Sequence, residues 1–291
     1  MDHHQKGLLL TALGVLIISP DVLLLRLISV PPDQLVLWRA LLNMLGFWLI
    51  VAARHRAAWP AAFRVCGLAG VGCALLFTVG TFGFVLGNHF TRAGNVLVIL
   101  ASTPLIAALL SRLFLHERLP LRTWLAIGVC LCGIGLIVLD DAGEGSLLGN
   151  LLALMSAVGL AGNLTLARSK PGIDMSPMLA LSGLFTAALT LAWSGHIMLP
   201  GPVDLGWLVL LCLVLIPAGF TLIQRGPLYL PSAEVSLLML LETVLGTLLV
   251  WLFLSERPSN QGLLGGAIVL LAMITKSVLD RRPFAAAPVR A

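Results

Sequence analysis

The sequence predicts an all-α polytopic membrane protein, with ten transmembrane helices in two inverted five-helix repeats. The first observation is composition: hydrophobic residues make up 59% of the 291 residues and charged residues 11%, and the mean hydropathy is +1.02. A soluble domain has roughly 45–50% apolar and about 25% charged residues. No soluble interior has room for this much apolar surface, so most of it must face lipid or neighbouring helices.

The second observation is an internal duplication. Leu-Phe-Leu-His-Glu-Arg fills residues 113–118, and Leu-Phe-Leu-Ser-Glu-Arg fills residues 252–257, 139 positions later. Each copy ends a long apolar segment and is followed by one more. The repetition predicts two halves built to one plan, residues 1–140 and 141–291, the second ending in a short cytoplasmic tail.

The third observation is segmentation, since a membrane span needs about 20 mostly apolar residues. Proline and glycine punctuate the apolar pattern at Pro31 and Pro32, Pro60, Pro120, residues 143–145, Pro171 and Gly172, residues 200–202, Pro227 and Pro231, and Pro258. The weakest break, residues 88–93, has no proline. The predicted spans are residues 7–28, 34–53, 64–87, 94–115, 122–139, 147–168, 176–195, 205–225, 233–254 and 261–280.

The basic residues predict the orientation, because cytoplasmic loops are enriched in Lys and Arg. One side of the predicted topology receives 14 of the 18: Lys6, Arg54, Arg56, Arg64, Arg112, Arg118, Arg122, Arg168, Lys170, Arg225, Lys276, Arg281, Arg282 and Arg290. The remaining four, Arg26, Arg39, Arg92 and Arg257, lie on the other side or inside spans. Both termini are therefore predicted to be cytoplasmic, in a multi-pass protein of the cytoplasmic (inner) membrane.

The odd number of spans in each half predicts how the halves are related. After five spans the second half enters the membrane from the opposite side, so the two halves form an inverted repeat. The first Leu-x-Glu-Arg motif then lies in the cytoplasm and the second outside.

Three features recur in the same order in both halves: a fourth span, its terminal Leu-x-Glu-Arg and a glycine-rich fifth span. They occupy residues 100–104, 115–118 and 128–135 in the first half, and residues 241–244, 254–257 and 262–266 in the second. Pro32, Leu35 and Arg39 of the second span also fit. With these features the chain resembles, over nearly its whole length, the drug/metabolite transporter superfamily in its ten-helix EamA-type branch.

The resemblance implies a secondary carrier with no enzyme activity and no cofactor, whose partners are the lipid bilayer and a small solute. Members most similar in general build are amino-acid exporters, but others move drugs or other metabolites, so the solute class stays open. Two departures lie near the expected cavity. Residues 18–21 replace a Trp-Gly or Trp-Ser step, and Thr243 stands where Pro commonly follows Glu242.

Asp21 and Arg39 are charges inside predicted spans, where a charge is costly and usually functional. Each lies seven residues from the outer end of its span, or about 10 Å deep at 1.5 Å per residue. A short loop joins the two helices, so the side chains are expected to be neighbours. They either lock the first hairpin as a structural ion pair or open and re-form as an outer gate.

Glu242 lies near the middle of the ninth predicted span, where an ionised carboxylate needs a cation, water or a proton. It either binds an ammonium group or carries a proton, or it is a hydrogen-bonded residue that pins the helix. Its counterpart in the first half is Thr103, and the two are expected to face each other deep in the bundle.

Further cavity candidates are polar or aromatic residues within spans, for each of which ordinary helix packing is the competing interpretation. They are Thr78, Thr81, Asn95, Asn163, Phe220, Thr221 and Gln224. Pro20, Pro104 and Pro217 lie inside spans and act either as hinges or as static kinks. Gly128 and Gly135 in the fifth span, like Gly262 and Gly266 in the tenth, favour close packing within a monomer or across a homodimer.

Other functions fit the sequence less well. A channel needs a continuous polar stripe, whereas these spans carry isolated polar residues. An intramembrane enzyme needs paired aspartates, a nucleophile with a base, or a histidine-rich metal set. The sequence has no phosphate-binding loop for nucleotide-driven pumping. The five cysteines lie in apolar segments and predict no metal site, and the dispersed basic residues predict no nucleic-acid partner.

Overall fold

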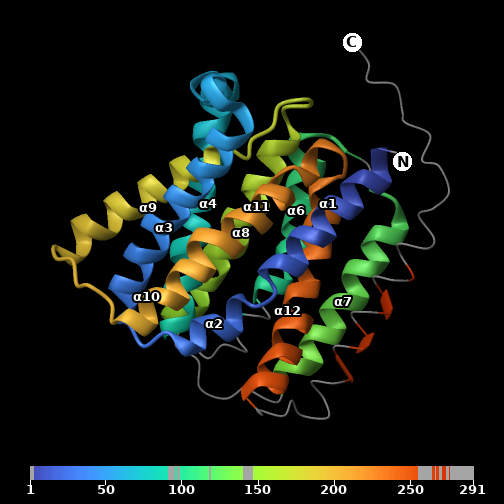
Figure 1. The fold of residues 1–291 in the computed structure, drawn as a ribbon. Helices are drawn as coiled ribbons and strands as arrows, with labels where there is room; N and C mark the ends of the chain where they lie inside the picture. Colours follow the sequence, from blue (N-terminus) through green and yellow to red (C-terminus); the bar gives the residue numbers. More distant parts are fainter. Residues whose placement is uncertain are drawn as a thin grey trace.

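The computed structural model describes residues 3–90, 96, 99–117, 119–139 and 147–254, with seven further positions between 264 and 275. Within this part of the chain all regular structure is helical, and the helices form one bundle (Figure 1). The first half contributes α1 (His3–Ile18), α2 (Asp21–Leu27), α3 (Pro32–His55), the 3-10 turn η1 (Arg56–Ala58), α4 (Trp59–Phe90), α6 (Thr103–Phe114) and α7 (Leu121–Leu139). The second contributes α8 (Leu147–Arg168), α9 (Met178–Ser194), α10 (Pro202–Leu208), the π-helical η2 (Val209–Leu215), α11 (Ile216–Gln224), the 3-10 turn η3 (Gly226–Leu228) and α12 (Ser232–Leu254).

Four helical stretches of the described chain are long and apolar enough to cross a membrane: His3–Leu25, Pro32–Phe90, Leu147–Arg168 and Pro202–Leu228. Three shorter apolar helices accompany them: Ile99–Phe114, Leu121–Gly133 and Met178–Ser194. The first nine predicted spans each coincide with described helix. Most of the tenth, residues 261–280, lies outside the described residues, so the count of ten remains a prediction.

The longest stretch, Pro32–Phe90, is a hairpin rather than one helix. At its basic turn Arg56 has a positive φ of 48°, which ends α3. Trp48 of α3 then lies edge-on to Trp59 of α4, with ring centroids 6.0 Å apart. Because Arg39 lies over Phe84 further along the same two helices, α3 and α4 are antiparallel.

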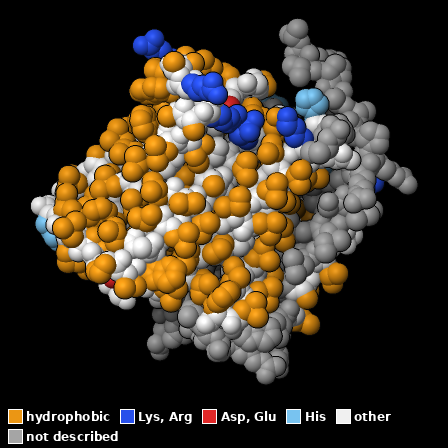
Figure 2. All heavy atoms as spheres, viewed as in Figure 1, with side chains coloured by type: hydrophobic (Ala, Val, Ile, Leu, Met, Phe, Trp, Pro, Cys, Tyr) orange, Lys and Arg blue, Asp and Glu red, His pale blue; other side chains and the backbone are white. Residues whose placement is uncertain are grey.

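Apolar side chains cover the flanks of the bundle, as expected for a surface in lipid. Leu68 is 89% exposed and Leu199 79%. Such exposure of apolar side chains is unfavourable in water but favourable in a bilayer. Figure 2 shows this apolar flank, with Lys and Arg gathered at the end where the N-terminus lies. We call this the basic end; among its charges are Arg54, Arg168 and Arg225, at the C-terminal ends of α3, α8 and α11.

Two helix crossings bring backbones into direct contact. α1 packs against α11, and α4 packs against α8. A Cβ added to Gly14 would lie 2.6 Å from the carbonyl oxygen of Gly219, and one added to Gly159 would lie 2.7 Å from the backbone nitrogen of Gly80. Only glycine permits either approach. α3 also packs on α9, and α6 on α12.

The three span prolines all lie at interruptions of regular α-helix. Pro20 separates α1 from α2, and Pro104 follows a turn at Ser102 to open α6. Pro217 lies in the first turn of α11, directly after the π-helical segment. A proline has no N–H and frees the carbonyl one turn earlier, which explains the interruptions. That these three prolines act either as hinges or as static kinks remains a prediction.

Candidate functional site

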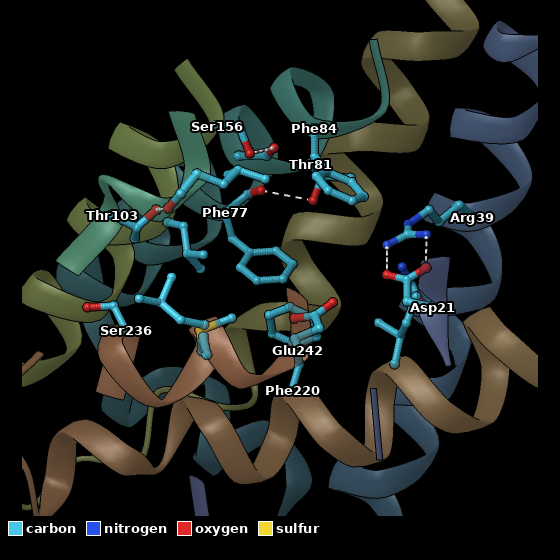
Figure 3. A pocket seen from close by; sticks show the side chains of 17 residues that line it. Asp21, Arg39, Phe77, Thr81, Phe84, Thr103, Ser156, Phe220, Ser236 and Glu242 are labelled. Atoms are coloured by element: carbon cyan, nitrogen blue, oxygen red, sulfur yellow. Dashed lines mark hydrogen bonds and ion pairs between the residues drawn. The ribbon is translucent and has the colours of Figure 1, made fainter. Parts of the chain in front are cut away.

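A cavity of about 130 Å³ lies inside the bundle and is lined from both halves of the chain. Its wall combines three ionisable side chains, several hydroxyls and a larger apolar surface (Figure 3). The lining residues are Asp21, Arg39, Asn43, Phe77, Gly80, Thr81, Phe84, Leu100, Thr103, Ser156, Leu160, Ile216, Phe220, Ser236, Met239, Leu240 and Glu242. The cavity is thus the meeting place of α2, α3, α4, α6, α8, α11 and α12.

Asp21 and Arg39 form a closed ion pair on one wall. The break at Pro20 places Asp21 in the first turn of α2, opposite Arg39 on α3. Nη1 and Nη2 of Arg39 donate to Oδ1 and Oδ2 of Asp21 at 2.9 and 2.8 Å. The side chains are only 7% and 4% exposed, and the guanidinium also lies 5.8 Å from the centre of the Phe84 ring. Bidentate geometry of this kind satisfies both charges.

Glu242 approaches the same cavity from α12, and its carboxylate has no such partner. Within the described part of the chain, no residue makes a hydrogen bond or ion pair with it. Figure 3 shows its carboxylate beside the Phe220 ring, on the side that faces Asp21 and Arg39. An ionised carboxylate in apolar surroundings requires a cation, water or a proton, so this group is available to a solute.

The four hydroxyl groups on the wall all donate hydrogen bonds to backbone carbonyls. Thr81 donates to Phe77 at 3.0 Å and Thr103 to Leu100 at 2.5 Å. Likewise, Ser156 donates to Gly80 at 2.8 Å, and Ser236 donates to Ser232 at 2.8 Å. The oxygens therefore present lone pairs, not protons, to the cavity.

Two aromatic rings form the apolar part of the wall nearest Glu242. Phe77 of α4 and Phe220 of α11 meet edge to face, with centroids 5.1 Å apart and planes at 82°. This is the arrangement that the ring quadrupoles favour. Because the two helices belong to different halves, the contact also joins the halves at the cavity.

Six of the predicted site residues share this cavity: Asp21, Arg39, Thr81, Thr103, Phe220 and Glu242. Thr103 and Glu242, expected to face each other, line it together. Four others lie between helices and are not among its lining residues. Asn163 and Gln224 join α8 to α11 through two hydrogen bonds of 2.8 and 3.1 Å, Thr78 donates to the Ser182 carbonyl at 3.1 Å, and Thr221 is buried. Asn95 lies outside the described residues.

Sequence reasoning missed four polar or polarisable lining residues: Asn43, Ser156, Ser236 and Met239. Asn43 lies four residues after Arg39, on the same face of α3, so helical spacing was an available signal. Its Oδ1 is buried without a hydrogen-bond partner among the described residues. The other three carry no sequence signal that separates them from ordinary packing residues.

At the basic end, ionic contacts join the two halves. Asp174, in the α8–α9 connection, pairs with Arg54 of α3 at 3.1 Å and with Arg225 at 3.2 Å. Glu117, from the first Leu-x-Glu-Arg, pairs with Arg168 of α8 at 2.9 Å. These side chains, at the span ends, are 22–37% exposed.

At the opposite end, hydrogen bonds and a 3.9 Å contact between His196 and Asp33 join the halves. Gln34 of α3 donates to the His196 carbonyl at 3.2 Å and accepts from the Met198 N–H at 2.9 Å. Trp38 donates to the Met198 carbonyl at 2.8 Å. The backbone N–H of Ser29 donates to Asp204 at 3.0 Å. The cavity therefore lies between two sets of contacts that join the halves.

A family model described as the EamA-like transporter family matches the chain twice, at residues 5–139 and 147–277. The chain belongs to the EamA-like transporter family. It is therefore an integral membrane transporter of small solutes, and the two matches correspond to its two repeats. No protein of curated function matches it in sequence.

A solved structure, titled only "Crystal structure of protein", has a similar fold. Its TM-score is 0.77 at 18% sequence identity, over 96% of this chain and 100% of that one. At this identity the likeness shows that the EamA-like chain shares a fold with it, and nothing about its solute.

Proposed function

We propose that this EamA-like protein is a secondary transporter that exports small metabolites, amino acids first among them, by alternating access through the central cavity. The observation that carries the proposal is the Glu242 carboxylate, which has no hydrogen-bond or ion-pair partner among the described residues, in a cavity lined by both repeats. A transporter needs a site that either half can expose, and a group there whose charge is completed by the solute.

The packing pattern supports an inverted relation between residues 1–140 and 141–291. If α1 is equivalent to α8 and α4 to α11, then the α1–α11 contact and the α4–α8 contact are one interaction seen twice. Each has a glycine on both helices at the closest approach, Gly14 with Gly219 and Gly80 with Gly159. The α3–α9 and α6–α12 contacts join equivalent helices, as expected next to a pseudo-twofold axis.

The two sets of contacts between the halves support alternating access. We place the basic end in the cytoplasm, since Lys and Arg concentrate on that side of bacterial-type membrane proteins, with both termini there and the protein in the inner membrane. Arginine–carboxylate pairs then join the halves on the cytoplasmic side, and mainly hydrogen bonds join them on the other. In the transport cycle one set breaks while the other holds.

A transport assay tests this proposal. Purified protein is reconstituted in liposomes and tested with radiolabelled amino acids, nucleosides and cationic drugs, each with and without a pH gradient. We expect an amino acid to cross protein-containing vesicles faster than empty ones, and Glu242→Gln to impair this. Glu144→Gln, which alters a carboxylate in the sequence between the two repeats, is the matched control.

Movement of a nucleoside or a drug but no amino acid would replace the amino-acid assignment with the other solute class. Full activity of Glu242→Gln at every pH would contradict the role of the cavity.

A further inference from the structure

The hydrogen-bonding capacity left unused in the cavity consists mainly of acceptors. Each of the four wall hydroxyls has given its proton to a backbone carbonyl. Both Nη atoms of Arg39 donate to Asp21. Among the described residues, what remains is the carboxylate of Glu242 and the side-chain amide of Asn43, which lies in the wall one turn from Arg39 and whose buried Oδ1 has no hydrogen-bond partner. A complementary solute must supply protons.

The charges lead to the same conclusion. Asp21 and Arg39 cancel each other at 2.8 Å, so an ionised Glu242 leaves this wall with one negative charge. A primary ammonium group neutralises that charge and brings three donors. A carboxylate on the solute, in contrast, must enter a negative, weakly polar space in which Arg39 is already occupied, and such burial is costly.

The size and lining of the cavity define the rest of the solute. A dry cavity of about 150 Å³ in another protein holds benzene, and this one measures about 130 Å³. Phe77 and Phe220 form an apolar wall beside Glu242 (Figure 3). One ring or a short branched alkyl group fits against these rings, and their faces also attract a cation.

We propose that the cavity recognises the primary ammonium group of a small solute carrying one ring or a short alkyl group. Glu242 is the acceptor, the Asn43 amide supplies a second polar contact, and a carboxylate on the solute is not required. This proposal rests on the proposed function, because it specifies the solute of the same cavity. Amino acids are then held by their ammonium group, and the corresponding decarboxylated amines bind at least as tightly.

Two matched series of probes test the proposal on the purified full-length protein in detergent, by calorimetric titration and by ligand-induced thermal stabilisation. The first series is phenethylamine, phenylalanine and phenylpropionate; the second is isopentylamine, leucine and isocaproate. We expect each amine to bind at least as tightly as its amino acid, and each deaminated acid neither to bind nor to compete.

Variants assign the effect to residues. Glu242→Gln is expected to weaken amine binding about tenfold or more, the loss of a charge-assisted pair. Asn43→Ala is expected to weaken it about two- to tenfold, the loss of one neutral hydrogen bond. Glu144→Gln, in the sequence between the two repeats, is expected to bind as wild type. The probe series alone tests the proposal on the wild-type protein if a variant fails to fold.

Three results would overturn the proposal: an acid that competes as well as its amine, binding of whole amino acids alone, or binding of no probe. The first two would show that Arg39 releases Asp21 to hold a solute carboxylate. Amine binding without transport in liposomes would leave this proposal standing and contradict the proposed function, so the two failures are distinguishable.

Discussion

Asp21 and Glu242 are carboxylates that line one cavity, and their surroundings differ. Asp21 accepts two hydrogen bonds from Arg39 and is almost fully buried. Glu242 has no partner among the described residues. We expect the satisfied buried pair to hold two helices in place and the Glu242 carboxylate to serve a solute or a proton. On this proposal the difference separates a structural charge from a functional one.

The largest expected effect comes from breaking the satisfied pair. Asp21→Asn or Arg39→Gln alone leaves a buried charge unpaired, and we expect a loss of about 3–5 kcal/mol in the free energy of unfolding. The double variant is expected to lose less than the sum of the singles, because neither charge is then left alone. Unfolding by SDS in mixed micelles measures all three variants. Additive losses would show that the pair does not act as a unit.

Glu242→Gln is expected to have a small effect on stability and a large effect on transport. No hydrogen bond within the described protein is lost, so the unfolding free energy changes by less than about 1 kcal/mol. Solute transport falls about tenfold or more, since a neutral amide cannot replace the charge. The same unfolding titration is paired with liposome transport at equal protein content. A strongly destabilised but active variant would reverse the assignment of the two carboxylates.

A cationic partner for Glu242 can be introduced by substitution. Met239 lies three residues earlier on α12 and lines the cavity, so Met239→Lys places an ammonium within reach of Glu242. We expect transport to fall as far as in Glu242→Gln, while Met239→Leu, the matched control, retains activity. Equal transport by the Lys and Leu variants would contradict a requirement for a free carboxylate.

The smallest expected effect concerns a third carboxylate, Asp174, which has two arginine partners and a side chain 22% exposed, against 4% for Asp21. Water screens such pairs, so Asp174→Asn is expected to cost less than about 1 kcal/mol in unfolding free energy. Comparison with Asp21→Asn in the same titration isolates the effect of burial. A loss for Asp174→Asn as large as that for Asp21→Asn would remove the distinction between the two environments.

Helix positions followed from the sequence because apolar runs and proline breaks are local signals. The sixth predicted span, residues 147–168, coincides with α8 (Leu147–Arg168). The first span, predicted as residues 7–28, is split at Ser19 and Pro20 into α1 and α2. The apolar run is continuous there, but the Ser19 hydroxyl donates to the Val15 carbonyl of its own helix and a proline follows, and together they end α1.

Only some of the residues that line the cavity could be predicted from the sequence. Counting residues from the span ends placed Asp21 beside Arg39, since depth depends only on helical rise. Asn163 and Gln224 were expected in the cavity, yet they bond to each other between α8 and α11. Which face of a helix turns inward is decided by close approaches such as Gly80 to Gly159, and these depend on residues far apart in the chain.

Modification by a hydrophobic carbodiimide tests the difference between Asp21 and Glu242 most directly. This reagent enters apolar cavities and adds to carboxylic acids that are not held in ion pairs, and mass spectrometry of the peptides locates the adduct. We expect an adduct on Glu242, none on Asp21, and protection of Glu242 by a bound small amine. An adduct on Asp21, or a Glu242 that stays unmodified without any ligand, would contradict it.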